Sequence, residues 1–198
     1  MPDSALVLVT GFGPFFQVDR NPSGELARLL EACPPDGFEV IGTELPVTFE
    51  GAGTALRDFV ASHRDRSPAF LLSLGVQRTP AFRLERNARA RLDSQKPDNE
   101  GRRASGVAVL GERDLSTTFD LEALAPCLQA DELEPVLLSE DAGGFVCERT
   151  YYELLVLSEE LGVPALFLHV PPWDAMAPER QVVHVRALLS EMQRFLGA

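Results

Sequence analysis

The chain has 198 residues, 45% of them hydrophobic, and carries a formal net charge of -12 at pH 7. This length and apolar content suit one sizeable buried core, so we expect residues 1–198 to form a single domain. The strong negative charge opposes binding to nucleic-acid backbones and to anionic membranes, which favours small molecules or peptides as partners.

The sequence predicts a soluble protein of a reducing compartment. No apolar run approaches the roughly 20 residues that span a bilayer, and the start of the chain lacks a basic stretch ahead of its short apolar run. Cys33, Cys127 and Cys147 are widely spaced and odd in number, which favours free thiols over a disulfide framework or a zinc site. We therefore expect a cytoplasmic location.

The first half of the chain alternates short apolar runs with helical patterns. Asn21 and Pro22 open the first helix with a capping residue and a proline at the first helical position. Leu26, Leu29, Leu30 and Cys33 then recur at helical spacing. In chain order we predict a strand over residues 5–9, this helix, a strand nearer the sheet edge over 38–47, a helix over 51–66 and a strand over 69–74.

Residues 78–103 are the one break in composition, with eight basic residues against four acidic ones and little periodicity. We interpret them as a long excursion from the core that forms oligomer contacts or a mobile lid. Nucleic-acid binding by this arginine-rich insert is the alternative.

The second half returns to alternating strands and helices. We predict strands over 135–138 and 165–170 and helices over 148–161 and 178–196, with the apolar runs buried on both faces as in parallel strands. The last helix carries one apolar stripe, formed by Val185, Leu188, Leu189, Met192, Phe195 and Leu196. Such alternation predicts an α/β fold, a three-layer α/β/α sandwich around a mostly parallel twisted sheet, with the site at the carboxyl ends of the strands.

Cys147 is a candidate nucleophile because of its position. Gly143 and Gly144 precede it, and the predicted helix over 148–161 follows it directly. The free N–H groups and positive dipole end of that helix would favour a thiolate and lower the pKa of the thiol. The alternative is a small, packed apolar side chain, since cysteine is among the most buried residue types.

His169 is the candidate base. It closes the apolar run at 165–170 just before two prolines, so its imidazole should lie at the carboxyl end of a strand, within reach of Cys147. A core histidine bonded to a backbone carbonyl is the alternative. His63 and His184, both within predicted helices, are expected to be solvated surface residues.

A nucleophile and a histidine base need a third group that orients the imidazole. The thirty acidic residues offer too many candidates for the pattern alone to select one. Glu85, flanked by arginines in RLERNARA, is by itself most simply interpreted as half of a solvated ion pair.

The stretch TGFGPFF at 10–16 places Phe12, Phe15 and Phe16 on a loop after the first strand. These aromatic rings either form an apolar slot for a flat ligand or cover the core. The loop lacks the GxGxxG fingerprint, and Pro14 stands where a phosphate-binding loop needs an N–H, so dinucleotide binding is not indicated.

Six segments in order complete the pattern. They are LVTGFGPFFQVDRNPSGELARLL, ELPVTFEGA, LLSLGVQRTPAFRLERNARA, KPDNEG, DAGGFVCERTYYELL and LFLHVPP. Together they resemble, over nearly the whole chain, the pyroglutamyl peptidase I family, which comprises the pyrrolidone-carboxylate peptidases of peptidase family C15. The resemblance implies a phosphorylase/hydrolase-like fold and one C15-like domain.

By that resemblance the catalytic cysteine, histidine and glutamate fall on Cys147, His169 and Glu85, and the slot for the pyroglutamyl ring involves Phe12 and Phe15. The implied function is a thiol protease that removes an N-terminal pyroglutamyl residue from small peptides. Neither a metal nor an organic cofactor is expected, and family members are often dimers or tetramers.

The oxyanion of the tetrahedral intermediate should be bound by backbone N–H groups at the helix start. These are the N–H groups of Gly144, Phe145, Val146 and Cys147.

Four departures from the family pattern leave alternatives open. They are Glu148 after the cysteine, Gln95 before the PDN stretch, Phe16 in the aromatic loop, and a shorter turn before Glu85. The alternatives are a catalytically silent relative that binds a lactam or a peptide terminus, and an enzyme with the same triad but a shifted substrate.

Overall fold

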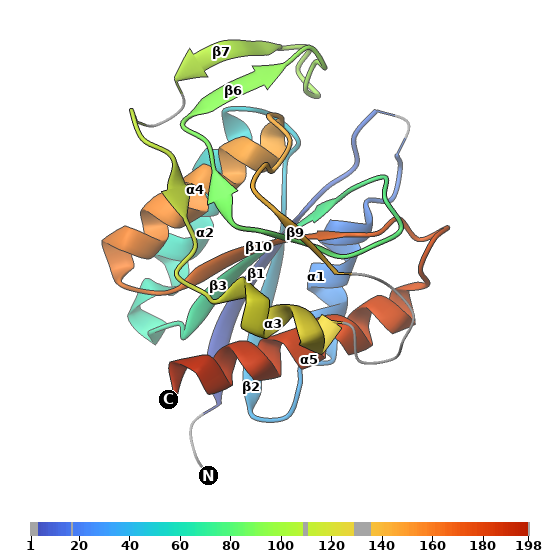
Figure 1. The fold of residues 1–198 in the computed structure, drawn as a ribbon, viewed down its shortest axis with the longest axis vertical. Helices are drawn as coiled ribbons and strands as arrows, with labels where there is room; N and C mark the ends of the chain where they lie inside the picture. Colours follow the sequence, from blue (N-terminus) through green and yellow to red (C-terminus); the bar gives the residue numbers. More distant parts are fainter. Residues whose placement is uncertain (1–3, 17, 109–110, 129–135, 198) are drawn as a thin grey trace.

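The computed structural model describes residues 4–16, 18–108, 111–128 and 136–197. Its centre is a six-stranded sheet in the order β2-β1-β3-β10-β4-β9 (Figure 1). The strands are β1 (Ala5–Phe12), β2 (Phe38–Leu45), β3 (Phe70–Val76), β4 (Arg83–Glu85), β9 (Leu137–Ser139) and β10 (Ala165–Val170). Strands β2, β1, β3 and β10 run parallel, whereas β4 is antiparallel to β10 and β9 follows the direction of β4.

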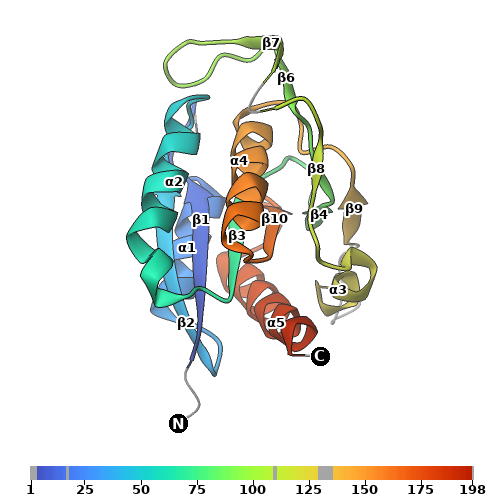
Figure 2. The same cartoon turned by 90° about the vertical axis from the view of Figure 1, so that its left-hand side faces the viewer.

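Helices cover both faces of this sheet (Figures 1 and 2). They are α1 (Pro22–Ala32), α2 (Gly51–His63), α3 (Leu121–Leu128), α4 (Val146–Leu161) and α5 (Pro178–Leu196), with a short 3-10 turn over Arg64–Arg66. Helices α2 and α4 share one apolar core with one face of the sheet, and α1, α3 and α5 share a second core with the other face. The predicted three-layer α/β/α sandwich around a mostly parallel sheet is confirmed.

Alternation along β10 links the two cores. Ala165 and Phe167 point toward α2 and α4, whereas Leu166 and Leu168 point toward the opposite layer, as the two-residue period of a strand requires. His169 continues the first series, so its side chain lies on the α4 side of the sheet.

Two small ribbons stand apart from the main sheet. Strand β5 (Asn87–Ala88) pairs with β8 (Leu115–Ser116), and β6 (Arg91–Ser94) pairs with β7 (Ala104–Ala108), each in antiparallel fashion. The β6–β7 ribbon projects at the end of the molecule where β1 finishes, opposite to the N-terminus (Figure 1).

The predictions for 78–103 and 135–138 need correction. The excursion carries more strand structure than its sequence suggests, because β4, β5 and β6 lie within it and β4 separates β10 from β9. In the second segment, Pro135 lies outside the described residues. Leu137 and Leu138 are 38% and 40% exposed rather than buried on both faces, because β9 is an edge strand with β4 as its one neighbour in the described sheet.

Two helical patterns are also less buried than predicted. In α1, Leu26 and Leu30 are buried whereas Leu29 is exposed, and Cys33 is an exposed residue just past the helix end. In α5 the buried stripe ends at Met192, and the two apolar residues at 195 and 196 are exposed. In the described part of the chain, none of the helices combines the length and the apolar character that crossing a bilayer requires.

Candidate active site

Two neighbouring antiparallel strands bring His169 and Glu85 together. In the register of β10 and β4, Glu85 stands opposite Phe167, one diagonal step from His169. His169 Nδ1 lies 2.5 Å from Glu85 Oε1, and the two residues are 3% and 0% exposed. Because a carboxylate accepts hydrogen bonds, the bond places the imidazole proton on Nδ1 and leaves Nε2 free to take a proton.

Gly75 makes room for this imidazole on the other side of β10. It pairs with His169 across β3 and β10, and a Cβ at position 75 would lie 2.9 Å from His169 Cδ2 and from the Phe167 ring. Any side chain there would push the imidazole. The one signal of this glycine's role in the sequence is its position directly after the apolar run at 69–74, which did not suffice to predict its contact with His169.

Cys147 lies in the first turn of α4, which begins two residues earlier than the helix predicted over 148–161. The helix begins at Val146, after Phe145 in an extended N-cap conformation whose side chain makes no capping bond. Cys147 is a free cysteine and is partly exposed as a residue. Within the described residues, the Cys147 sulfur makes no hydrogen bond with His169. The two groups are related electrostatically, because the charge of Glu85 acts on the pKa of each.

The pKa of Cys147 differs from the expectation. Burial raises it to about 12, and the negative charge of Glu85 adds to the rise, while Arg83 opposes it. The helix N-terminus is present, but loss of water around the sulfur outweighs it. The prediction of a lowered thiol pKa is therefore wrong.

Burial also lowers the pKa of His169, with a contribution in the same direction from Arg83, although the hydrogen bond to Glu85 opposes this shift. A raised thiol pKa and a lowered imidazole pKa both favour uncharged groups. The resting site therefore holds a neutral thiol and a neutral imidazole at neutral pH.

Glu148, the residue after Cys147, is fully buried and fully engaged. Its carboxylate accepts the backbone N–H of Arg89 at 2.7 Å, the N–H of Gly144 at 3.1 Å and the Arg89 guanidinium at 2.9 Å. Burial raises the pKa of Glu148, while the bonds to Arg89 and Gly144 act against the rise. Arg89 thus compensates the additional negative charge beside the cysteine.

The same contacts affect the expected oxyanion donors. The N–H of Gly144 is taken by Glu148, whereas those of Phe145, Val146 and Cys147 are at the helix start, where N–H groups lack partners within the helix. Gly144 has a φ of 66°, and a Cβ there would lie 2.8 Å from the carbonyl oxygen of Asp93. Glycine therefore allows the β6 strand to pack directly on the loop before Cys147.

The aromatic residues of the first loop occupy different depths. Phe12 is 3% exposed, Phe15 is half-buried and Phe16 is 56% exposed. Phe12 lies in the apolar core shared by α2, α4 and one face of the sheet, and Phe15, Phe145 and Cys147 pack against that same core. Phe16 has a φ of 48°, a left-handed conformation that favours glycine.

A buried turn holds this loop in place. Asp98 is 4% exposed, and its carboxylate accepts N–H groups from Phe49, Glu100 and Arg102 at 2.9, 3.0 and 2.9 Å. The next residue, Asn99, donates from its side chain to the carbonyl of Pro14 at 2.9 Å. The KPDNEG segment, noted in the sequence as a motif, thus joins the excursion to the aromatic loop.

The other histidines lie outside this arrangement. His184 was expected at the solvated surface, but it is 7% exposed and its ring lies 5.4 Å from that of Phe82. The correction follows from α5 packing on the sheet with this side of the helix inward. His63 is half-buried and bonds to the carbonyl of Phe59 at 2.8 Å, so it is a helix-end residue in contact with its own helix.

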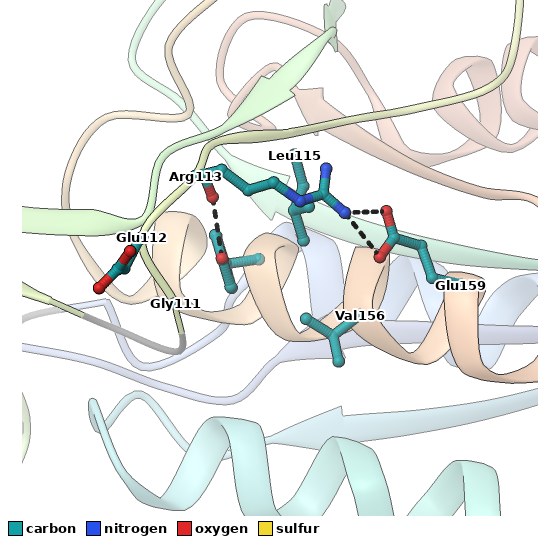
Figure 3. Close-up of a pocket in the computed structure, with 7 residues that line it drawn as sticks. Gly111, Glu112, Arg113, Leu115, Val156 and Glu159 are labelled. Atoms are coloured by element: carbon teal, nitrogen blue, oxygen red, sulfur yellow. Dashed lines mark hydrogen bonds and ion pairs between the residues drawn. The ribbon is translucent and has the colours of Figure 1, made fainter.

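A surface hollow of about 470 Å³ lies between residues 111–115 and α4. Figure 3 shows the Arg113 ion pair with Glu159 at its edge, and the Tyr152 hydroxyl donates to the Arg113 carbonyl. Its lining contains none of the predicted catalytic residues. The hollow is therefore separate from the candidate active site.

Among the described residues, no group of three or more histidine, cysteine, aspartate or glutamate side chains is arranged to hold a metal ion. Cys33 and Cys147 are free thiols, and the side chain of Cys127 lies outside those described.

A cysteine at a helix start beside a buried histidine-carboxylate pair, in a three-layer α/β fold, is the arrangement of a cysteine hydrolase. The model of a family described as pyroglutamyl peptidase matches residues 5–188, and the chain belongs to this family. The family expected from the sequence is confirmed.

Individual relatives agree with this assignment. A pyrrolidone-carboxylate peptidase of Klebsiella pneumoniae is 33% identical over 175 residues, which cover 86% of this chain and 80% of that protein. The crystal structure of the pyrrolidone carboxyl peptidase from Thermus thermophilus is 33% identical and has a TM-score of 0.81, with 92% of this chain and 98% of that chain covered. The one from Fervidobacterium islandicum is 27% identical with a TM-score of 0.86, over 96% of this chain and 99% of that chain.

Proposed function

We propose that this protein is a cysteine exopeptidase that hydrolyses the amide bond after an N-terminal pyroglutamyl residue of small peptides. Cys147 is the nucleophile, His169 the general base and acid, and Glu85 the residue that orients the imidazole. The observation that carries the proposal is the buried hydrogen bond between His169 and Glu85 beside the start of α4. The names of the relatives support the substrate class.

The chemistry begins from neutral groups. As the sulfur of Cys147 attacks the pyroglutamyl carbonyl carbon, its proton passes to Nε2 of His169, and the imidazolium is stabilised by Glu85. Backbone N–H groups of Phe145, Val146 and Cys147 stabilise the negative oxygen of the tetrahedral intermediate. Gly144 contributes by the backbone turn before the helix rather than by its N–H, which is engaged by Glu148.

The second half of the reaction returns the site to its starting state. His169 gives its proton to the leaving amine as the carbon-nitrogen bond breaks, which leaves a thioester on Cys147. Water then loses a proton to His169 and attacks the thioester, and collapse of this intermediate releases pyroglutamate and restores the thiol. No step requires a metal or an organic cofactor.

Substrate selection follows from the chemistry of the blocked terminus. Pyroglutamate is an uncharged lactam without the ammonium group that ordinary aminopeptidases recognise, so a flat apolar slot with few polar partners suits it. Phe15 is half-buried and packs against the same apolar core as Cys147, and we assign it as the accessible wall of the slot, whereas Phe12 is buried in that core.

The remaining expectations extend this proposal. The whole chain, residues 1–198, acts as one catalytic domain in the cytoplasm, and it assembles as a dimer or tetramer. Light scattering on the purified protein measures the mass of the assembly and distinguishes these states from a monomer.

The activity is tested with a fluorogenic pyroglutamyl amide under reducing conditions, with the Cys147→Ala variant and an alanyl amide alongside. Release that requires both Cys147 and the pyroglutamyl ring supports the proposal. Absence of release from folded protein, together with retained binding of pyroglutamate, would favour the silent relative. Release from a different amide in a substrate panel, again dependent on Cys147, would favour a shifted substrate.

A further inference from the structure

Arg83 lies directly at the histidine-carboxylate pair. In the β10–β4 register it stands opposite His169, and Arg83 and Glu85 share one face of β4 because they are two residues apart. Arg83 Nε donates to Glu85 Oε1 at 2.6 Å, the same oxygen that lies 2.5 Å from His169 Nδ1. One carboxylate oxygen therefore serves two nitrogen donors.

A second guanidinium nitrogen also lies close to the imidazole. Arg83 Nη2 lies 3.2 Å from His169 Nδ1. When Nδ1 carries its proton, both nitrogens are donors and do not bond to each other, so the imidazole and the guanidinium are joined through Glu85 Oε1, which accepts from Nδ1 and from Arg83 Nε. Glu85 Oε2 is buried and has no partner within the described part of the chain, so the carboxylate is held through its Oε1 contacts.

We propose that Arg83 is a positioning residue of this site: its guanidinium holds the Glu85 carboxylate in place and supplies a fixed positive charge that keeps His169 uncharged between turnovers. The proposal rests on the proposed function, because it assigns Arg83 a part in the same reaction. Without Arg83, Glu85 would face the imidazole as its one counter-charge, and a protonated, inactive base would be favoured.

Few other titratable groups surround the pair. Strand β4 supplies Arg83. Helix α4 supplies the Cys147 thiol, Glu148 and Tyr151, whose hydroxyl donates to the backbone carbonyl of Glu85 at 2.8 Å. The charge of Glu148 is balanced by Arg89, which reaches it from the segment after β5. Among the described residues, Arg83 is therefore the cationic side chain that contacts both His169 and the Glu85 carboxylate directly.

The electrostatic effect has one direction for both reacting groups. Arg83 lowers the pKa of Cys147 and that of His169, against the effect of Glu85 on each. Removing the charge should raise both values. A residue that merely braced β4 would change stability without moving either.

The test uses Arg83→Gln and Arg83→Met, two uncharged variants of similar length, with Arg83→Lys to preserve the charge. Arg66→Gln is the matched control, because Arg66 pairs with Glu39 in an exposed ion pair on β2 and the 3-10 turn. The first readout is the rate of alkylation of Cys147 by iodoacetamide, followed by mass spectrometry of its peptide between pH 6 and 10. The second is the pH dependence of kcat/KM for the pyroglutamyl amide.

We expect the uncharged variants to alkylate about ten-fold more slowly at any given pH, and the acid limb of kcat/KM to move up by about one pH unit. Arg83→Lys and Arg66→Gln should keep the wild-type profiles. An Arg83→Ala variant should recover activity when guanidinium ion is added and should not respond to urea, its neutral analogue.

The proposal would be overturned if folded Arg83→Gln or Arg83→Met kept the wild-type alkylation rate of Cys147 and the wild-type acid limb of kcat/KM. It would also be overturned if urea restored the activity of Arg83→Ala as well as guanidinium ion does. The alkylation measurement needs no substrate. If the wild-type protein fails to cleave the pyroglutamyl amide while its alkylation still responds to Arg83, the proposed function fails and the electrostatic part of the Arg83 assignment stands.

Discussion

His169 Nδ1 and Glu85 Oε1 lie 2.5 Å apart on neighbouring antiparallel strands, both shielded from solvent. The backbone ladder between β10 and β4, rather than a loop, fixes their relative position. An imidazole held in this way presents Nε2 in one orientation, which is the requirement for a histidine that must first accept and then return a proton.

The first prediction concerns Glu85→Gln. The amide keeps the size of the side chain but loses the charge that stabilises the imidazolium, so we expect kcat to fall by about 10² to 10⁴-fold with a small change in KM. Steady-state kinetics on the pyroglutamyl amide measure this. A fall confined to KM would contradict the orienting role.

The second prediction concerns Gly75→Ala. The new Cβ would lie 2.9 Å from the His169 ring, so the imidazole must move, and we expect at least about a ten-fold loss of kcat. Gly197→Ala is the control, because a Cβ there meets its nearest atom at 3.7 Å, an ordinary contact. Equal activity of the two variants would mean that β3 does not determine the position of the histidine.

The third prediction concerns Glu148→Gln. Loss of this charge weakens the contact between the buried Glu148 side chain and the partly exposed Arg89 side chain. It also places an amide N–H against one of the N–H groups from which Glu148 accepts, so we expect the free energy of unfolding to drop by about 1–3 kcal/mol. Urea denaturation measures it. Glu140→Gln, at an exposed ion pair with Arg86, should change the same quantity by less than about 0.5 kcal/mol.

The fourth prediction concerns pH. Because burial lowers the pKa of His169, the imidazole stays neutral as the pH falls through 6.5, and the acid limb of kcat/KM should lie below that value. Because the pKa of Cys147 is raised to about 12, its thiol stays protonated, and iodoacetamide should modify it more than about ten-fold more slowly than free glutathione at pH 7. Faster alkylation than glutathione would indicate a resting thiolate instead.

Local sequence signals alone made Cys147 and His169 candidates for the site. Glycines followed by a helical pattern mark a helix start, and an apolar run followed by prolines marks the end of a strand. Both signals depend on neighbours within a few residues, and the structure places both residues where these signals predicted. The same holds for the four parallel strands and the predicted helices.

Glu85 could not be selected in this way, because its environment is created by a distant part of the chain. Strand β4 has three residues, too few to show a period, and its partner His169 is 84 positions away. Only the family resemblance pointed to this glutamate. Pairing with β10 is what turns an expected surface ion pair into a fully buried carboxylate.

The prediction of a lowered pKa for the Cys147 thiol was wrong for a related reason. A helix N-terminus can be predicted from sequence, but the amount of protein packed around the sulfur cannot. The ion pair in which Arg89 balances the charge of Glu148 could likewise not be predicted from the sequence, because the two residues are 59 positions apart.

The turn around Asp98 implies an order of events during folding. Its bonds to Phe49 and from Asn99 to Pro14 join residues 49 and 85 positions apart, so they can form only after distant segments have come together. We expect the sheet and its helices to assemble before the walls around the thiol do. A refolding chain would then regain its far-ultraviolet circular dichroism earlier than its ability to hold a ligand, and the interval between the two would report the docking of this turn.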